Sequence, residues 1–316
     1  MMVLSAVFHL LIFPGFLFLS VVGLLLAGID RKVLAHMQRR IGPPVMQPVY
    51  DFFKLLGKET IIPAGANPYV YRAAPVVSVA SLTVLALFIP VAGIAGFSGP
   101  SDLIVILYLL TIPGVALVVS GFASGSPFGG IGSSRELITM ISYEMPFIIV
   151  LLAVAKKAGG SGLAFGLQDI LSWQGGNGSM ISHITMIPAA IALLLIIPAE
   201  AGLHPFDVAE AETEICEGAL VEYSGTPLAL FKMSTSMKML LMAVLFVDLF
   251  LGGLKTGMLI PDILIFVLLT IAVTIVSMTL PHAVAARLKA EHLFRFFWTW
   301  VSAFALISLV LAWCGL

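Results

Sequence analysis

A dense group of acids is the part of this chain best suited to chemistry. Residues 200–222 hold no Lys or Arg and seven carboxylates, which are Glu200, Asp207, Glu210, Glu212, Glu214, Glu217 and Glu222. If residues 206–217 form one helix, Asp207, Glu210, Glu214 and Glu217 share a face. Neighbouring carboxylates repel one another, and they lower their energy by sharing protons or by pairing with cations. Because Ala, Ile, Val and Gly interleave the acids, proton sharing or pairing with cations is favoured over the alternative of a solvated acidic face.

Four more ionisable residues lie in or beside apolar runs. Glu136 opens one run and Glu144 lies within it, whereas Lys232 and Lys238 lie in the first part of another. A charged side chain inside a membrane costs at least ~3 kcal/mol unless it is paired, hydrated or neutral. We therefore interpret Glu144 and Lys238 as functional, with a purely structural buried pair as the alternative.

The composition is that of a polytopic membrane protein. Apolar residues make up 60% of the chain and charged residues 10%, and the mean hydropathy is +1.10, which water-soluble domains do not reach. The sequence predicts an all-α bundle of about eight transmembrane helices in a single membrane domain, residues 1–316. The apolar runs long enough to span a bilayer lie near residues 3–29, 73–95, 102–123, 137–155, 180–199, 227–251, 259–284 and 293–316.

The charges of the connecting segments predict an orientation. Basic residues concentrate in the segments around residues 30–72, 124–136 and 285–292, whereas the opposite side holds only Lys156, Lys157 and Lys255. The excess of Lys and Arg marks the cytoplasmic side. We therefore expect an outside N-terminus in the cell membrane and a cytoplasmic loop, residues 200–226, that contains the acids.

The first of these segments carries its own signals. Arg31, Lys32, Arg39 and Arg40 precede a Pro-rich turn, and we interpret them as a docking surface for a partner, with ordinary positive-inside anchoring as the alternative. The following residues 47–57 predict a short amphipathic helix in the membrane interface.

No metal site is expected in this chain. Cys216 and Cys314 are isolated, and His36, His204 and His282 lack the short spacing of metal ligands. We interpret these histidines as packing or hydrogen-bonding residues.

Four ordered motifs carry a resemblance. DRKVLAHMQRRIGP, SRELITMISYEMP, HPFDVAEAETEICEGALVEYSGTPLALF and ARLKAEHLFRFFW together resemble the complex I subunit 1 family. This family joins the peripheral arm to the membrane arm of respiratory complex I. It also has relatives in membrane-bound [NiFe] hydrogenases, of the formate hydrogenlyase type and in archaea. The similarity covers the chain from its first helix to its last.

The resemblance implies an eight-helix subunit without a cofactor of its own. Its partners would be a [NiFe]-like large subunit and an Fe–S small subunit on the cytoplasmic side, and antiporter-like and small membrane subunits in the bilayer. The Fe–S clusters, and a [NiFe] site in the hydrogenase branch, would belong to those partners. The seven acids would match the family's acidic funnel, with Glu136 and Glu144 along the continuing ion path and Arg39 and Arg40 at the basic contact.

Three departures bear on the branch. Only Pro44, Val45 and Met46 separate IGP from the QP of the interfacial helix, where complex I members usually have a longer segment that contributes to a quinone chamber. Lys232 and Lys238 resemble the hydrogenase branch. His204 stands where the respiratory branch often has Arg, so an Arg-dependent contact there is not expected.

We therefore expect a subunit of a ferredoxin-linked hydrogenase or sulfur reductase that couples electron transfer to H⁺ or Na⁺ translocation. A quinone-site subunit of a complex I-type enzyme is the first alternative. A free-standing secondary transporter is the second, although the paired repeats typical of transporters are not evident, and a passive anchor is the third.

Overall fold

The computed structural model describes residues 2–93, 97–160, 162–254 and 258–315. The side chains of residues 2–6, 212, 213 and 259 lie outside this description, as do Lys255 and the side chain of Glu212.

The described residues are mostly helical and form no β-strand element. Seven of their helical spans are long and apolar enough to cross a membrane, and an eighth, Ile184–Glu200, is shorter. The predicted all-α bundle of about eight helices is confirmed. The seven spans are Val7–Met37, Pro68–Phe88, Asp102–Ala123, Pro127–Gly159, Gly225–Leu251, Ile260–Val284 and Ala290–Trp313.

Several spans combine two or three labelled elements. The first contains the end of α1 (Met2–Leu11) and all of α2 (Phe16–Met37). Single helices form the next three, α4 (Pro68–Phe88), α5 (Asp102–Ala123) and α6 (Pro127–Gly159), and the short span ends in α8 (Ile187–Glu200). Each of the last three spans contains a π-helical turn. The first of them consists of α10 (Gly225–Phe246) and η5 (Val247–Leu251), and the second of α11 (Leu259–Thr274), η6 (Ile275–Thr279) and α12 (Leu280–Val284). The third consists of α13 (Ala290–Phe296), η7 (Phe297–Val301) and α14 (Ser302–Trp313).

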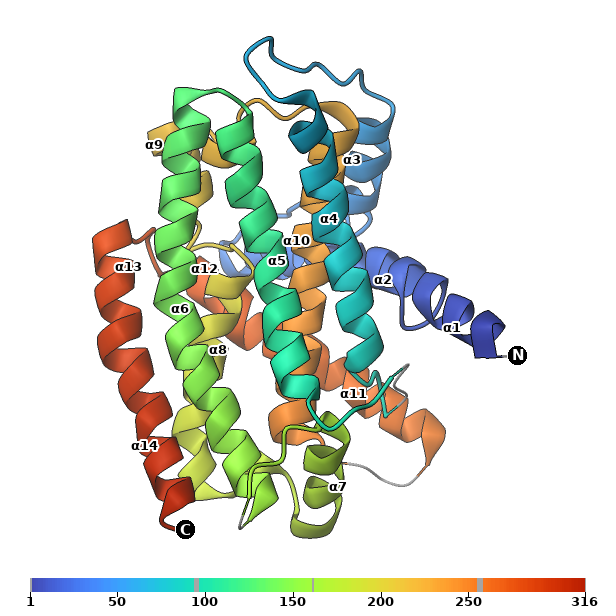
Figure 1. The fold of residues 1–316 in the computed structure, drawn as a ribbon, viewed down its shortest axis with the longest axis vertical. Coiled ribbons are helices and arrows are strands. Elements are labelled where there is room, and N and C mark those ends of the chain that lie inside the picture. Colours follow the sequence, from blue (N-terminus) through green and yellow to red (C-terminus); the bar gives the residue numbers. More distant parts are fainter. Residues whose placement is uncertain (1, 94–96, 161, 255–257, 316) are drawn as a thin grey trace.

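The helix α10 lies at the centre of the bundle (Figure 1), where α2, α4 and α8 pack against it. The most hydrophobic window of the α10 span is 89% buried, compared with 28% in the span that ends at Trp313. A helix buried all round can place polar side chains away from lipid. The central helix is therefore the one best placed to carry Lys238 into the core.

Two long helices begin or end differently from the prediction. The helix α6 begins at Pro127, so Glu136 lies within it and does not open it, and α2 extends to Met37, so Arg31 and Lys32 lie on a helix. In both cases polar residues continue a helix beyond its apolar run, which hydropathy alone does not detect. The interfacial helix is confirmed as α3 (Gln47–Leu56).

A buried glutamine joins α7 (Leu167–Asn177) to the end of α10. Gln174 Nε2 donates to the carbonyls of Asp248 and Leu249 in η5 at 2.8 and 3.1 Å. Its Oε1 accepts from the backbone N–H groups of Met180 and Gly253. These bonds satisfy backbone groups around the π-helical turn and fix the end of the bundle opposite the acidic segment (Figure 1).

The acidic segment, residues 200–222, is not one helix, so the predicted stripe of four carboxylates is wrong. It contains the short elements η3 (Val208–Glu210), α9 (Glu212–Ile215) and η4 (Gly218–Leu220). Cys216 and Glu217 have positive φ values of 50° and 68°, followed by Gly218 at 50°. Left-handed backbone ends a right-handed helix, so Asp207, Glu210, Glu214 and Glu217 do not share one helix face.

Candidate functional site

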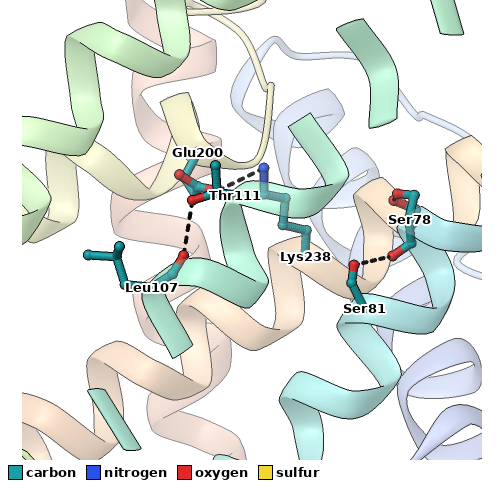
Figure 2. Close-up of polar contacts among 7 residues, drawn as sticks. Ser78, Ser81, Leu107, Thr111, Glu200 and Lys238 are labelled. Atoms are coloured by element: carbon teal, nitrogen blue, oxygen red, sulfur yellow. Dashed lines mark hydrogen bonds and ion pairs between the residues drawn. The ribbon is translucent and has the colours of Figure 1, made fainter. Parts of the chain in front are cut away.

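A buried ion pair lies at the core of the site. Lys238 Nζ of α10 is 2.8 Å from Glu200 Oε1 at the end of α8 (Figure 2), and the side chains are only 7% and 3% exposed. Burying both charges is tolerable because each offsets the desolvation of the other. The sequence indicated that Lys238 needs such a partner, and the partner is Glu200.

A small polar cavity adjoins this pair. Its volume is about 40 Å³, which is room for about three water molecules. Asp207 Oδ1 is buried and accepts no hydrogen bond from the described residues, so it needs water as a partner. The polar side chains that line this inner cavity are those of Ser78, Glu136, Glu200, Asp207, Glu210, Ser234, Thr235 and Lys238.

A larger cavity lies outside the inner one, between α2, α3 and α10. It has a volume of about 450 Å³, within the range of small-molecule sites. Glu210 and Thr235 line both cavities, so they stand in the wall between them. The ionisable residues that line the outer cavity are Asp30, Arg31, Asp51, Lys54, Lys58, Glu210, Glu217 and Lys232.

The carboxyl group of Glu210 holds its proton strongly. Burial raises its pKa from 4.5 to about 8, and the charges of Glu136, Glu217 and Asp207 add to this effect, whereas Lys232 opposes it. A carboxylic acid of that pKa exchanges protons near neutral pH. Proton sharing, one of the two expectations for the acidic segment, stays a prediction.

Pairing with cations, the other expectation, occurs in the acidic segment. Arg287 Nη2 lies 2.8 Å from Asp207 Oδ2, and Arg135 Nη1 of α6 donates to Glu214 Oε2 at 2.5 Å. These two arginines hold the segment from different elements, one after α12 and one on α6. They were visible in the sequence only as members of the basic segments.

The end of the acidic segment is fixed by aromatic residues that the sequence did not single out. The rings of Tyr71 and Tyr223 stack at 4.1 Å with an interplanar angle of 1°. The Tyr71 hydroxyl donates to the Glu222 carbonyl at 2.8 Å and accepts from Ser224 N–H at 3.3 Å. Burial raises the pKa of Tyr223 to about 12, so it remains a neutral packing residue.

The remaining predicted path residues lie at the edge of the site. Glu144 is half-buried on α6 and does not line the inner cavity, but its carboxylate is in the electrostatic field of Glu200 and Lys238. Lys232 is exposed on the outer cavity. Glu222 is half-buried and contributes its carbonyl to the tyrosine contact.

The predicted docking residues divide into two groups. Arg31 Nη1 lies 3.5 Å from Asp51 Oδ2 of α3, and Lys32 Nζ donates to the Ile41 carbonyl at 2.9 Å. These two hold α3 and its turn against α2. Arg39 and Arg40 are exposed at the turn after α2.

Comparison with known proteins places the chain in a family. A family model described as NADH dehydrogenase matches residues 9–313. Hydrogenase-4 component C of Escherichia coli is 37% identical over 228 residues, which are 72% of this chain and 70% of that protein. NADH-quinone oxidoreductase subunit 8 of Thermus thermophilus is 33% identical over 309 residues, which are 92% of this chain and 82% of that protein.

A solved structure has the same fold over almost the whole length. A chain in the structure of the membrane-bound sulfane sulfur reductase, an archaeal respiratory membrane complex, matches with a TM-score of 0.87 and 28% identity, and 98% of each chain is covered. The relatives therefore come from hydrogenase, quinone oxidoreductase and sulfur reductase complexes. The chain is a multi-pass membrane protein of the NADH dehydrogenase family, the complex I subunit 1 type that its motifs indicated.

Proposed function

We propose that this chain couples electron transfer in a peripheral redox arm to H⁺ or Na⁺ translocation in the membrane arm of a ferredoxin-linked energy-converting complex. The observation that carries this proposal is the inner cavity, because it brings Glu136, Asp207 and Glu210 together with the buried Glu200–Lys238 pair. Charged groups that share one small, wet cavity change protonation together.

The proposed coupling is electrostatic. Reduction of an Fe–S or metal centre in a partner above the acidic segment adds negative charge there. That charge raises the proton affinity of Glu210 and Asp207, and the inner cavity transmits the change to Glu136 and the Glu200–Lys238 pair. Glu144, whose carboxylate is in the electrostatic field of that pair, would transmit this change in charge toward antiporter-like membrane subunits.

The proposed partners and orientation follow from surface charge. The exposed Arg39 and Arg40 would bind the Fe–S small subunit and the [NiFe]-like large subunit. The bias of Lys and Arg toward the acidic side supports a cytoplasmic acidic segment and an outside N-terminus. The same side would then receive both electrons and protons, as coupling requires.

The test uses the complete complex purified with this chain and reconstituted in vesicles. Reduced ferredoxin is supplied, and ion uptake is measured together with acceptor reduction. We expect Glu136→Gln and Glu210→Gln to suppress ion movement while acceptor reduction continues, with Glu291→Gln, 75% exposed, as the matched control. Normal ion movement in both core variants contradicts coupling, and lost assembly with normal coupling in the remaining complexes supports a passive anchor.

A second candidate is a quinone-site subunit, which the volume of the outer cavity favours. Eight ionisable residues line that cavity. When an apolar quinone ring displaces their water, these residues lose hydration, which costs free energy. We therefore rank this function second. Competition between a quinone analogue and the terminal acceptor, abolished by a bulky Ala229→Trp substitution in the cavity wall, would favour it.

A further inference from the structure

Two histidines far apart in sequence form a stacked pair beside the acidic segment. The rings of His204 and His282 have their centroids 4.6 Å apart with an interplanar angle of 24°. His204 precedes η3, and His282 belongs to α12, so the pair bridges the acidic segment and the end of the α11 span. Both residues are half-buried, and His204 Nδ1 is buried without a hydrogen-bond partner among the described residues.

Charged groups of both signs surround the pair. Asp207 and Arg287, which bind each other at 2.8 Å, act on His204 from the acidic segment and from the residues after α12. On the other side, Asp30 of α2 interacts with His282, accepts a hydrogen bond from Thr279 at 2.5 Å and is flanked by Arg31. Two carboxylates, Asp207 and Asp30, and the guanidinium group of Arg287 therefore act directly on the pair.

This environment disfavours two positive charges. Burial lowers the pKa of His204, and His282 and Arg287 lower it further, whereas Asp207 opposes the shift. Two imidazolium rings stacked at 4.6 Å would repel strongly. One imidazolium beside a neutral ring, with Asp207 and Asp30 on either side, has no such penalty, because carboxylates stabilise the single charge.

We propose that His204 and His282 share a single proton and that this proton competes with Arg287 for Asp207. With the pair neutral, Arg287 holds Asp207. With a proton on His204, the imidazolium repels Arg287 and offers Asp207 a second cation, which frees the carboxylate to exchange partners.

The location of the pair relates it to the cavities. Leu203 lines the outer cavity, and Gly202 and Asp207 line the inner one, so His204 belongs to the segment that separates them. A proton on the pair changes the charge at this wall without entering the bundle. In this respect the inference rests on the proposed function, since it makes the histidine pair the proton-uptake element for the inner cavity.

The test measures each histidine separately in the purified complex. Exchange of the imidazole C2 hydrogen for deuterium, followed by mass spectrometry across the pH range of imidazole titration, gives a midpoint for each ring. The exposed His292 is the internal reference. We expect the His204 midpoint to lie below the ordinary value of an imidazole. The substitutions His282→Gln and Arg287→Gln should raise this midpoint, and Asp207→Asn should lower it.

The matched control is His292→Gln, which should leave the His204 midpoint unchanged. A His204 midpoint that stays at its wild-type value in both His282→Gln and Arg287→Gln overturns the inference. Ion translocation is measured separately, and His204→Gln should shift its pH dependence. Coupled midpoints in a wild-type complex that moves no ions would refute the proposed function and leave the shared proton intact.

Discussion

Lys238 and Glu200 form an ion pair of 2.8 Å at the centre of the bundle, although they come from different helices and both are almost completely buried. The pair ties the end of α8 to the middle of α10, the most buried span. It also borders the inner cavity. The pair is therefore both a tie between two helices and part of the wall of the inner cavity.

Breaking this pair should destabilise the protein strongly. Lys238→Met leaves Glu200 buried without its cation, and Glu200→Gln leaves the ammonium without its anion. Loss of one partner of a buried ion pair costs about 3–5 kcal/mol. The double substitution should recover much of this loss, because no uncompensated charge remains.

Thermal unfolding of the detergent-solubilised protein checks this double-mutant cycle. The exposed Arg295–Glu291 pair, 75% exposed on both sides, supplies the control, since Arg295→Met should leave the unfolding midpoint unchanged. Additive effects of the two core substitutions would show that the charges do not interact.

Stability should also depend on the proton of Glu210. The unfolded carboxyl group ionises near pH 4.5, whereas in the folded protein burial raises its pKa to about 8. Between these values the folded state binds more protons than the unfolded state, so the contribution of Glu210 to stability falls as pH rises through the window. Above about pH 8 both states are ionised, and the loss is complete.

Glu210→Gln should flatten this part of the pH profile, because the amide does not titrate. The midpoint of thermal unfolding, measured from about pH 4.5 to about pH 8, shows the difference. Glu291→Gln, at an exposed position, should retain the wild-type slope. Parallel slopes for Glu210→Gln and wild type would mean that Glu210 is ionised throughout.

The sequence predicted the elements that depend on hydropathy and missed those that depend on tertiary contact. Eight apolar spans, the interfacial helix and the family follow from local patterns. The shape of the acidic segment does not, because Cys216 and Glu217 adopt left-handed backbone that their residue types do not favour. Packing against α5 and α6, together with the two arginine contacts, holds this conformation.

The sequence also did not show which side chains within the chain pair with one another. Glu144 and Glu200 both end or interrupt apolar runs, and only the packing of α8 on α10 selects Glu200 for Lys238. His204 and His282 seemed isolated because their contact joins distant segments. The sequence showed which residues are ionisable, but their contacts became visible only once the helices were packed together.

Removing the Tyr71 hydroxyl should loosen the end of the acidic segment. Tyr71→Phe keeps the ring stacked on Tyr223 but loses the bonds to the Glu222 carbonyl and the Ser224 N–H. Each such bond is worth about 1 kcal/mol. Backbone amide exchange of residues 218–224, followed by mass spectrometry, should become faster.

Tyr108→Phe is the control for this change, because its side chain is 68% exposed on α5. It should leave exchange in residues 218–224 as in the wild type. Equal protection in Tyr71→Phe would mean that the aromatic stack alone fixes this end of the segment.

A single methyl group on α6 should displace the acidic segment. A Cβ at Gly132 would meet the Ala219 nitrogen and come within 2.8 Å of Gly218 Cα, both parts of backbone in η4. Backbone cannot rotate away as a side chain can, so Gly132→Ala should cost about 1–3 kcal/mol through overpacking. Gly130, on the same helix, has nothing within 4 Å of its added Cβ.

The pair of variants separates packing from helix propensity. Alanine favours helix over glycine at both positions, so Gly130→Ala should keep or raise the unfolding temperature, whereas Gly132→Ala should lower it. Gly132→Ala should also speed amide exchange in residues 208–222, since η4 holds the acidic segment against α6. If both variants behave alike, the close approach of Gly132 to Gly218 does not hold the segment, and the arginine and tyrosine contacts must do so.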